Sequence, residues 1–153
     1  LCDLEYHDQN LAKPIADEIS AIQESFFKKN APTLEALSKK YRLGIISNFT
    51  GNLEIILNEY KLHKYFEHVL DSYHIGFSKP DIQIFEEALK RFKLPAENCM
   101  FIGDNIERDV LPAKSLGMKT VLIHEPKHGR HYNPGPDAYV LEIRELLDLT
   151  QKM

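Results

Sequence analysis

Two acidic residues five positions apart follow an apolar run in the second half of the chain. The run Cys99–Ile102 predicts a buried strand, and Gly103 and Asp104 come directly after it, with Asp109 further on. Carboxylate oxygens are hard ligands, and Mg²⁺ needs only one or two of them beside water and substrate phosphate. Asp104 and Asp109 are therefore candidate magnesium ligands. Asp109 could also be the N-cap of a following helix that has Pro112 in its first turn, and the two roles are compatible.

A hydroxyl, an amide and a lysine elsewhere in the chain suit an anionic substrate. Ser47 and Asn48 follow the apolar run Leu43–Ile46, and a hydroxyl and turn amides at such a place can donate to a phosphate. Lys79 precedes Pro80 and a predicted helix, so its charge and the positive end of that helix point the same way. Each group alone has an ordinary explanation, the first pair as a helix cap and the lysine as a solvated surface residue.

An alternation of apolar runs and amphipathic segments must position these residues. Helical periodicity predicts a helix over 14–29, which Ala31-Pro32-Thr33 should break, before a short helix that ends at Lys39-Lys40. Strands are predicted at 43–46, 69–70, 99–102, 120–123 and 138–140, and helices near 53–60, 81–92, 109–116 and 142–149. This alternation predicts an α/β fold, a Rossmann-like parallel sheet with helices on both faces. Ligands of such sheets bind beyond the carboxyl ends of the strands, so Ser47 and Asp104 should share one rim.

The order and spacing of these groups resemble three of the four motifs of the haloacid dehalogenase-like (HAD) hydrolase superfamily. Ile45–Phe49 is similar to the second motif, Lys79-Pro80-Asp81 to the third, and the stretch from Gly103 to Asp109 to the fourth. Asp71-Ser72, between the second and third motifs, also looks familiar. The resemblance covers roughly residues 31 to 145, and three motifs in register make a chance match improbable.

The resemblance implies a role for each site residue. Ser47 and Asn48 would bind phosphate, Lys79 would bind phosphate and stabilise the nucleophile as a catalytic residue, and Asp104 and Asp109 would hold Mg²⁺. The implied activity is Mg²⁺-dependent phosphomonoester hydrolysis of a small metabolite through an aspartyl-phosphate. A non-catalytic member that keeps the phosphate and metal site is the alternative. A 2-haloacid dehalogenase is less favoured, because those enzymes usually lack the acidic pair.

The first motif of the superfamily, a buried strand ending in Asp-x-Asp-x-Thr, has no good counterpart. Asp3 and Glu5 have the required spacing, but Glu5 replaces the second Asp, His7 replaces the Thr, and two residues before Asp3 are too few for a buried strand. We therefore expect the chain to begin partway through the protein and to be inactive by itself. On this interpretation residues 1–30 are the remnant of a helical cap. Residues 31–153 are then a HAD-like core without its central first strand, which a missing N-terminal segment supplies.

The composition is that of an ordinary globular domain. The 153 residues are 43% hydrophobic and carry a net charge of −4, which gives no basic surface for nucleic acid, and no apolar run is long enough for a membrane span. Cys2 and Cys99 have no metal-like spacing, which favours a reducing, cytoplasmic setting. His124, His128 and His131 have a spacing that zinc can use, but their glycine and proline neighbours favour a solvated loop.

Overall fold

The computed structural model describes residues 9–123 and 133–152, and within these ranges helices and strands alternate along the chain. The strands are β1 (Gly44–Ser47), β2 (His68–Asp71), β3 (Met100–Gly103), β4 (Lys119–Ile123) and β5 (Ala138–Val140). The α-helices are α1 (Gln9–Ser38), α2 (Leu53–Glu59), α3 (Ser72–Ile75), α4 (Ile82–Phe92), α5 (Leu111–Ser115) and α6 (Leu146–Lys152). Short 3₁₀ turns are η1 (His63–Tyr65), η2 (Ala96–Asn98) and η4 (Ile143–Glu145), and η3 (Ile106–Val110) is a π-helical turn.

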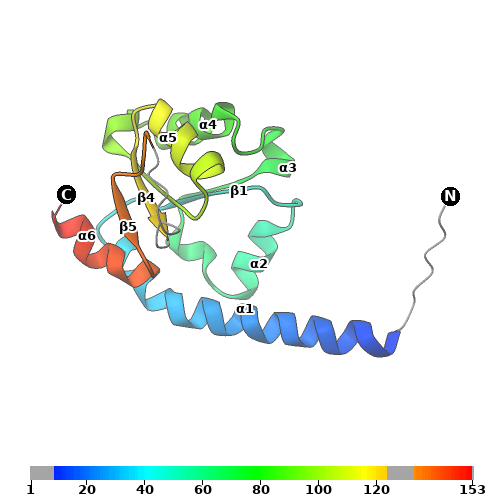
Figure 1. Cartoon of the computed structure of the whole chain (residues 1–153). Coiled ribbons are helices and arrows are strands. Elements are labelled where there is room, and N and C mark those ends of the chain that lie inside the picture. Colours follow the sequence, from blue (N-terminus) through cyan, green and yellow to red (C-terminus); the bar gives the residue numbers. More distant parts are fainter. Residues whose placement is uncertain (1–8, 124–132, 153) are drawn as a thin grey trace.

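The strands form a middle layer with α4 and α5 on one side and α1 and α6 on the other (Figure 1). All strand pairs are parallel, which confirms the predicted α/β fold with helices on both faces. The strands are divided between two sheets, however, with the orders β1-β2 and β3-β4-β5. Within the described ranges none of the helices is both long and apolar enough to cross a membrane.

Each face of the strand layer has its own core. One core joins Leu70 of β2 to the α4 residues Ile84 and Phe85 and to Ala113 of α5, and all four side chains are fully buried. The other core joins Leu37 of α1 to strands β4 and β5 and to helix α6. The first core therefore connects the two sheets through α4 and α5, although β1 and β3 are not hydrogen-bonded to each other.

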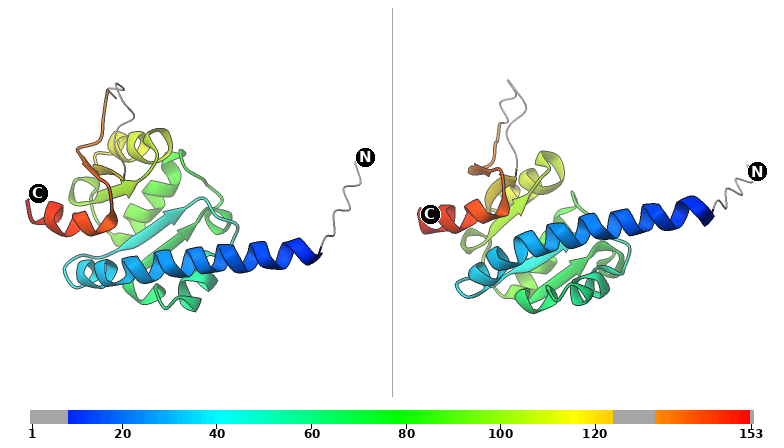
Figure 2. Two further views of the ribbon diagram at one scale, coloured as in Figure 1. Left: turned by 60° about the horizontal axis from the view of Figure 1, so that its bottom comes forward. Right: turned by 90° about the horizontal axis from the view of Figure 1, so that it is seen from below.

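Helix α1 is continuous from Gln9 to Ser38, so the predicted break at Pro32 was wrong. Proline inside a helix removes one backbone hydrogen bond and costs about 3 kcal/mol. Packing compensates for that cost, because Thr33 and Leu37 in the turns that follow Pro32 are buried, and Leu37 belongs to the second core. Figure 2 shows the N-terminal half of α1 projecting past the rest of the molecule. The expected cap boundary at residue 30 falls inside this helix.

Strands β1 and β3 are less buried than the sequence predicts. Three residues of β4 are buried, whereas β1 and β3 contain none, and Ile102 of β3 is 36% exposed. The physical reason is that β4 has a strand neighbour on both sides, while β1 and β3 each pair along one edge within the described chain.

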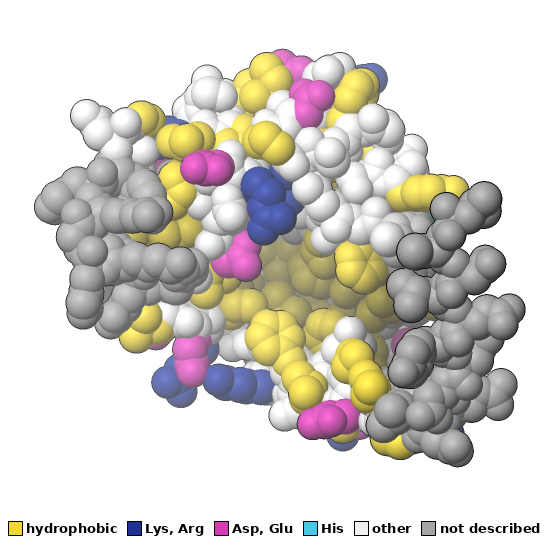
Figure 3. Space-filling view, turned by 45° about the vertical axis from the view of Figure 1, so that its right-hand side comes forward, with side chains coloured by type: hydrophobic (Ala, Val, Ile, Leu, Met, Phe, Trp, Pro, Cys, Tyr) yellow, Lys and Arg dark blue, Asp and Glu magenta, His cyan; other side chains and the backbone are white. Residues whose placement is uncertain are grey.

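An apolar groove of about 720 Å³ lies between the two sheets. Its walls come from β1 and β3, and its other lining includes Leu37, Leu70, Ala88, Leu89, Phe92, Met118 and Leu146. Figure 3 looks into a hollow with a hydrophobic floor and with basic and acidic side chains on its rim. The side chains of β1 and β3 that an additional central strand would cover are therefore partly exposed in this groove.

Substitution of two isoleucines on α4 tests how much the buried core beneath the site contributes to the stability of the fold. Ile84→Ala removes a side chain that is 0% exposed, and we expect the free energy of unfolding to fall by about 2–5 kcal/mol. Ile82→Ala, two residues earlier and 42% exposed, should change it by less than about 1 kcal/mol. Urea unfolding followed by circular dichroism measures both. Equal losses would contradict the packing described here.

Candidate active site

Lys79 lies at the centre of the polar cluster where the strands end. Its Nζ is 2.7 Å from Oδ1 of Asp109, and the two side chains are only 15% and 3% exposed. The ammonium also lies 5.5 Å from the ring centroid of Phe101, and that ring packs edge-on against Phe85. An ion pair removed from water is strongly coupled, because water screens it little. Lys79 is thus a fixed positive charge, and its alternative role as a solvated surface lysine is wrong.

The side chain of Asn48 makes two hydrogen bonds to the main chain of Lys79. Its Nδ2 donates to the Lys79 carbonyl at 2.8 Å, and its Oδ1 accepts from the Lys79 N–H at 2.8 Å. Both polar groups of the amide are therefore engaged by a segment 31 residues away. This geometry makes Asn48 a clamp for Lys79, while a phosphate contact from its side chain stays a prediction.

Asp109 organises the turn after β3. Its Oδ2 accepts from the N–H groups of Asp104 at 3.2 Å and Asn105 at 3.1 Å. The turn is tight, because a Cβ on Gly103 would come within 2.4–2.6 Å of Asp109 side-chain atoms. Asp109 lies within η3 and is not the N-cap of a helix, so that alternative was wrong. Asn105 is the cap, and its Oδ1 accepts from the Arg108 N–H at 2.9 Å.

Two carboxylates at this turn fit the needs of Mg²⁺. Oδ1 of Asp109 is buried and has, among the described residues, the Lys79 ion pair but no well-directed hydrogen bond, so it retains lone pairs for a cation. Asp104 lies on the exposed side of the same turn. No cluster of three or more acidic, histidine or cysteine ligands exists in the part of the chain that the structure describes. The donor set therefore matches a metal that keeps water and phosphate as its other ligands.

The structure brings most of the predicted site residues together. Lys79 contacts both Asn48 and Asp109, and the backbone N–H of Asp104 donates to Asp109. Ser47 is the half-buried last residue of β1, directly before Asn48. It does not cap α2, whose N-cap is Asn52, so the cap explanation was wrong. Other predictions lie outside the described residues: those on Cys2, Asp3, Glu5, His7, His124, His128 and His131.

Two residues to which the sequence assigned no role support the site. Phe101 provides the ring beside the Lys79 ammonium, and Asp71 is a carboxylate, 3% exposed, at the end of β2. Asp71 could have been found by the strand-end rule, because it follows an apolar pair and lies in register with Ser47. Phe101 could not, since an aromatic residue in an apolar run is normally a core residue.

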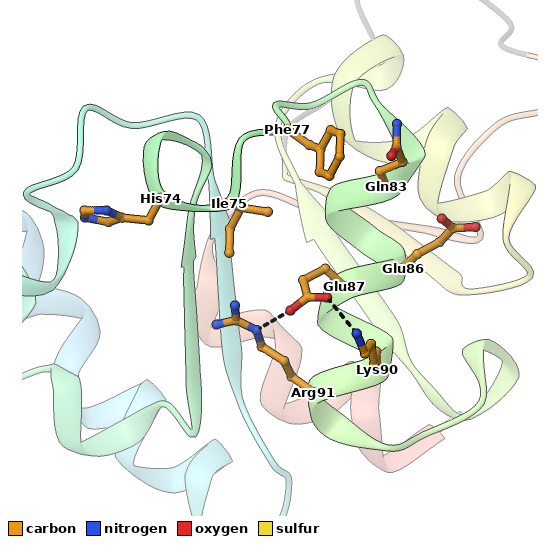
Figure 4. Close-up of a pocket in the computed structure, with 8 residues that line it drawn as sticks. All are labelled: His74, Ile75, Phe77, Gln83, Glu86, Glu87, Lys90 and Arg91. Atoms are coloured by element: carbon orange, nitrogen blue, oxygen red, sulfur yellow. Dashed lines mark hydrogen bonds and ion pairs between the residues drawn. The ribbon is translucent and has the colours of Figure 1, made fainter.

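A second hollow of about 370 Å³ lies between α3 and α4 and contains none of the predicted site residues (Figure 4). Glu87 makes ion pairs there with Arg91 at 2.9 Å and Lys90 at 3.8 Å. The hydrogen bond from Arg91 is the main reason that the pKa of Glu87 is lowered. Glu87 in this hollow is thus paired with two cations, and its side chain is 31% exposed, whereas the Asp109 side chain at the rim is 3% exposed.

Comparisons with known proteins all point to one family. The model of the haloacid dehalogenase-like hydrolases matches residues 6–123. The rhythmically expressed gene 2 protein of Drosophila melanogaster is 37% identical over 97 residues, which cover 61% of this chain and 37% of that protein. Glyceraldehyde 3-phosphate phosphatase of Methanothermobacter thermautotrophicus is 35% identical over 105 residues, which cover 68% of this chain and 46% of that protein. The chain thus spans less than half the length of these two relatives.

Two solved structures resemble the chain equally well. One is a HAD phosphatase from Thermococcus onnurineus, with a TM-score of 0.69 and 28% identity over 78% of this chain and 55% of that chain. The other is a 2-haloacid dehalogenase from Pseudomonas syringae pv. Tomato, with a TM-score of 0.69 and 28% identity over 79% of this chain and 51% of that chain. Backbone similarity therefore does not discriminate between the two reactions.

Replacing Lys79 tests whether the ion pair holds the rim together. Lys79→Met leaves the Asp109 carboxylate buried without its cation, and we expect the free energy of unfolding to fall by about 3–5 kcal/mol. Lys90→Met is the matched control. Its ammonium is 3.8 Å from Glu87 and its side chain is 82% exposed, so the loss should stay below about 1 kcal/mol.

Adding Asp109→Asn to Lys79→Met should restore much of the lost stability, because the unpaired charge is then removed. Urea unfolding of the wild-type chain and of these three variants gives the comparison. If Lys79→Met costs no more than Lys90→Met, the pair does not hold the rim.

Proposed function

We propose, since the chain belongs to the haloacid dehalogenase-like hydrolases, that it is the core of a Mg²⁺-dependent phosphatase of small phosphorylated metabolites. The observation that carries this proposal is the buried Lys79–Asp109 pair at the rim, with Asp104 on the same turn. A fixed cation beside two carboxylates provides for both a phosphate and a metal. Relatives named as glyceraldehyde 3-phosphate phosphatases support a substrate of this class.

Each site residue has a defined task in phosphoryl transfer. The reaction depends mainly on positioning and on neutralising the charge of the transferred group. The Lys79 ammonium would neutralise a phosphoryl oxygen, and the Ser47 hydroxyl would donate to another. Asp104 and Asp109 would hold Mg²⁺, which supplies further charge neutralisation when it is bound. Asn48 would keep Lys79 in place through its two hydrogen bonds to the main chain.

The nucleophile would come from a segment that docks in the groove between β1 and β3. Within the described ranges each of these strands pairs along one edge only, and an extended segment parallel to them could form hydrogen bonds on both sides. A helix would leave those backbone groups unsatisfied. The carboxyl end of such a strand would reach the rim beside Lys79. We place the aspartate of the first motif at that end.

The chemistry then proceeds in two balanced steps. A carboxylate oxygen of that aspartate bonds to phosphorus as the bond from phosphorus to the ester oxygen breaks, and the leaving alkoxide takes up a proton. Water next attacks phosphorus of the aspartyl-phosphate, releasing inorganic phosphate and the free carboxylate. The described residues supply no nucleophile for the first step, so we propose that this chain alone is inactive.

The exposed apolar side chains of α1 support the proposal that residues 1–30 are part of a cap. Ile15, Ile19, Ile22 and Phe26 are 51–63% exposed and lie on one face of the projecting part of the helix. Further cap helices, from the segment that we propose supplies the first strand, would cover this face. Such a cap would select the metabolite. A cytoplasmic setting for the protein remains an expectation from cysteine usage.

A 2-haloacid dehalogenase remains the alternative, because a solved structure of such an enzyme resembles the chain as well as the phosphatase structure does. Halide displacement also uses a carboxylate nucleophile but needs no metal, so Asp104 discriminates between the two. A non-catalytic phosphate-binding protein is the third candidate.

The full-length protein from the same gene tests these functions. We expect it to hydrolyse an aryl phosphate only with Mg²⁺, and Asp104→Asn to lower kcat/KM by about 100-fold, in line with loss of one charge-stabilising group. Asp148→Asn, an exposed acid on α6, is the matched control and should leave kcat/KM within about twofold.

Three outcomes would contradict the proposal in different ways. Undiminished activity of the 153-residue chain would remove the need for a supplied nucleophile. Metal-independent chloride release from 2-chloropropionate would favour a dehalogenase. No turnover by the full-length protein, with phosphate binding retained, would favour the non-catalytic alternative.

A further inference from the structure

Asp71 is a buried carboxylate that the phosphatase mechanism does not use. It ends β2 in register with Ser47, and it is 3% exposed. Its oxygens accept three backbone hydrogen bonds, from Gly51 at 2.9 Å, from Leu53 at 3.4 Å and from Tyr73 at 3.0 Å. No ion pair involves Asp71 within the described chain, so these N–H groups compensate its burial.

Two residues next to Asp71 hold the same loop. The Ser72 hydroxyl accepts from the Phe49 N–H at 3.1 Å and donates to the Phe49 carbonyl at 3.2 Å. Nε2 of His74 lies 2.9 Å from the Gly51 carbonyl and donates to it. Gly51 itself has φ of +96°, and a Cβ there would come within 2.8 Å of the Tyr73 ring. The loop 49–53 is thus fixed from the end of β2.

This loop continues directly from Asn48, the residue that clamps Lys79. We propose that Asp71 is a positioning residue for the active site: it fixes the loop 49–53, and through Asn48 it sets where the Lys79 ammonium stands. The path runs from the Asp71 carboxylate to the Gly51 and Leu53 amides, along the backbone to Asn48, and across to the Lys79 main chain. Its catalytic meaning rests on the proposed function, but the positioning itself does not.

In the 153-residue chain, the contacts of Lys79 connect the ends of β1 and β3. β1 and β3 are not hydrogen-bonded to each other, so the end of β1 cannot be aligned with the end of β3 by a shared ladder. Lys79 contacts both ends, Asn48 after β1 and Asp109 after β3. Without the Asp71 carboxylate, the N–H groups of Gly51, Leu53 and Tyr73 would lose the acceptor of their part-buried hydrogen bonds, and the loop that continues from Asn48 would shift. A displacement of about 1 Å at a catalytic group can cost about 100-fold in rate.

The experiment compares two carboxylate variants by NMR of the 153-residue chain. Asp71→Asn should move the Asn48 side-chain amide and Lys79 backbone amide resonances toward random-coil values and speed exchange of the Lys79 amide by about tenfold. Asp137→Asn is the matched control. Its carboxylate also accepts backbone and hydroxyl hydrogen bonds, from Thr120, but at the start of β4 and so at the opposite end of the sheet. It should leave both resonances in place.

In the full-length protein, Asp71→Asn should lower kcat for an aryl phosphate by about 100-fold, and Asp137→Asn should leave it within about twofold. If Asp71→Asn fails to fold, Ser72→Ala removes only the Phe49 contacts and should move the same two resonances. Unchanged Asn48 and Lys79 resonances would overturn the inference, as would equal shifts in Asp71→Asn and Asp137→Asn. Shifts specific to Asp71→Asn would support it even if the wild-type full-length protein proved inactive, which would count against the phosphatase alone.

Discussion

The ion pair between Lys79 and Asp109 is the contact on which the arrangement of the rim depends. Lys79 precedes α4 and is clamped by Asn48 at the end of β1, while Asp109 belongs to the turn after β3. The pair therefore ties together the ends of two sheets that share no strand ladder. Its burial also means that neither charge can be replaced alone without leaving the other uncompensated.

The pair prepares the site before any substrate arrives. A lysine on an exposed loop would lose side-chain freedom and water on binding phosphate, and both losses oppose binding. Lys79 has already lost them in the folded chain, since Asp109, the Phe101 ring and the Asn48 clamp fix it. A substrate phosphate, as proposed above, would therefore bind to a cation that is already ordered by folding. This is electrostatic preorganisation in its simplest form.

The sequence predicted what local pattern and strand order decide. Apolar runs located the strands, and the rule that parallel strands end on one rim correctly placed Asn48 near the turn that contains Asp109. Lys79 follows no strand, and it was predicted from its place before a helix and from the family resemblance. The sequence did not predict which partner each polar group takes, because that depends on distant segments. The Asn48 amide meets a backbone 31 residues away, and Asp109 faces Lys79 and the amides of its own turn instead of capping a helix. Pro32 does not end α1 as predicted, because the burial of Thr33 and Leu37 outweighs the cost of the lost backbone hydrogen bond.

The division of the strands into two sheets has a consequence for the order of folding. β1 with β2 and β3 with β4 are each close in sequence, and α4 and α5 join them through one buried core. These contacts can form early, since closing short loops costs little entropy. A strand that pairs with both β1 and β3 can insert only after both sheets have formed. Its insertion would therefore be a late step in folding. The proposed catalytic aspartate would then be the last residue of the site to reach its position. The site would therefore have no activity until the whole domain had folded.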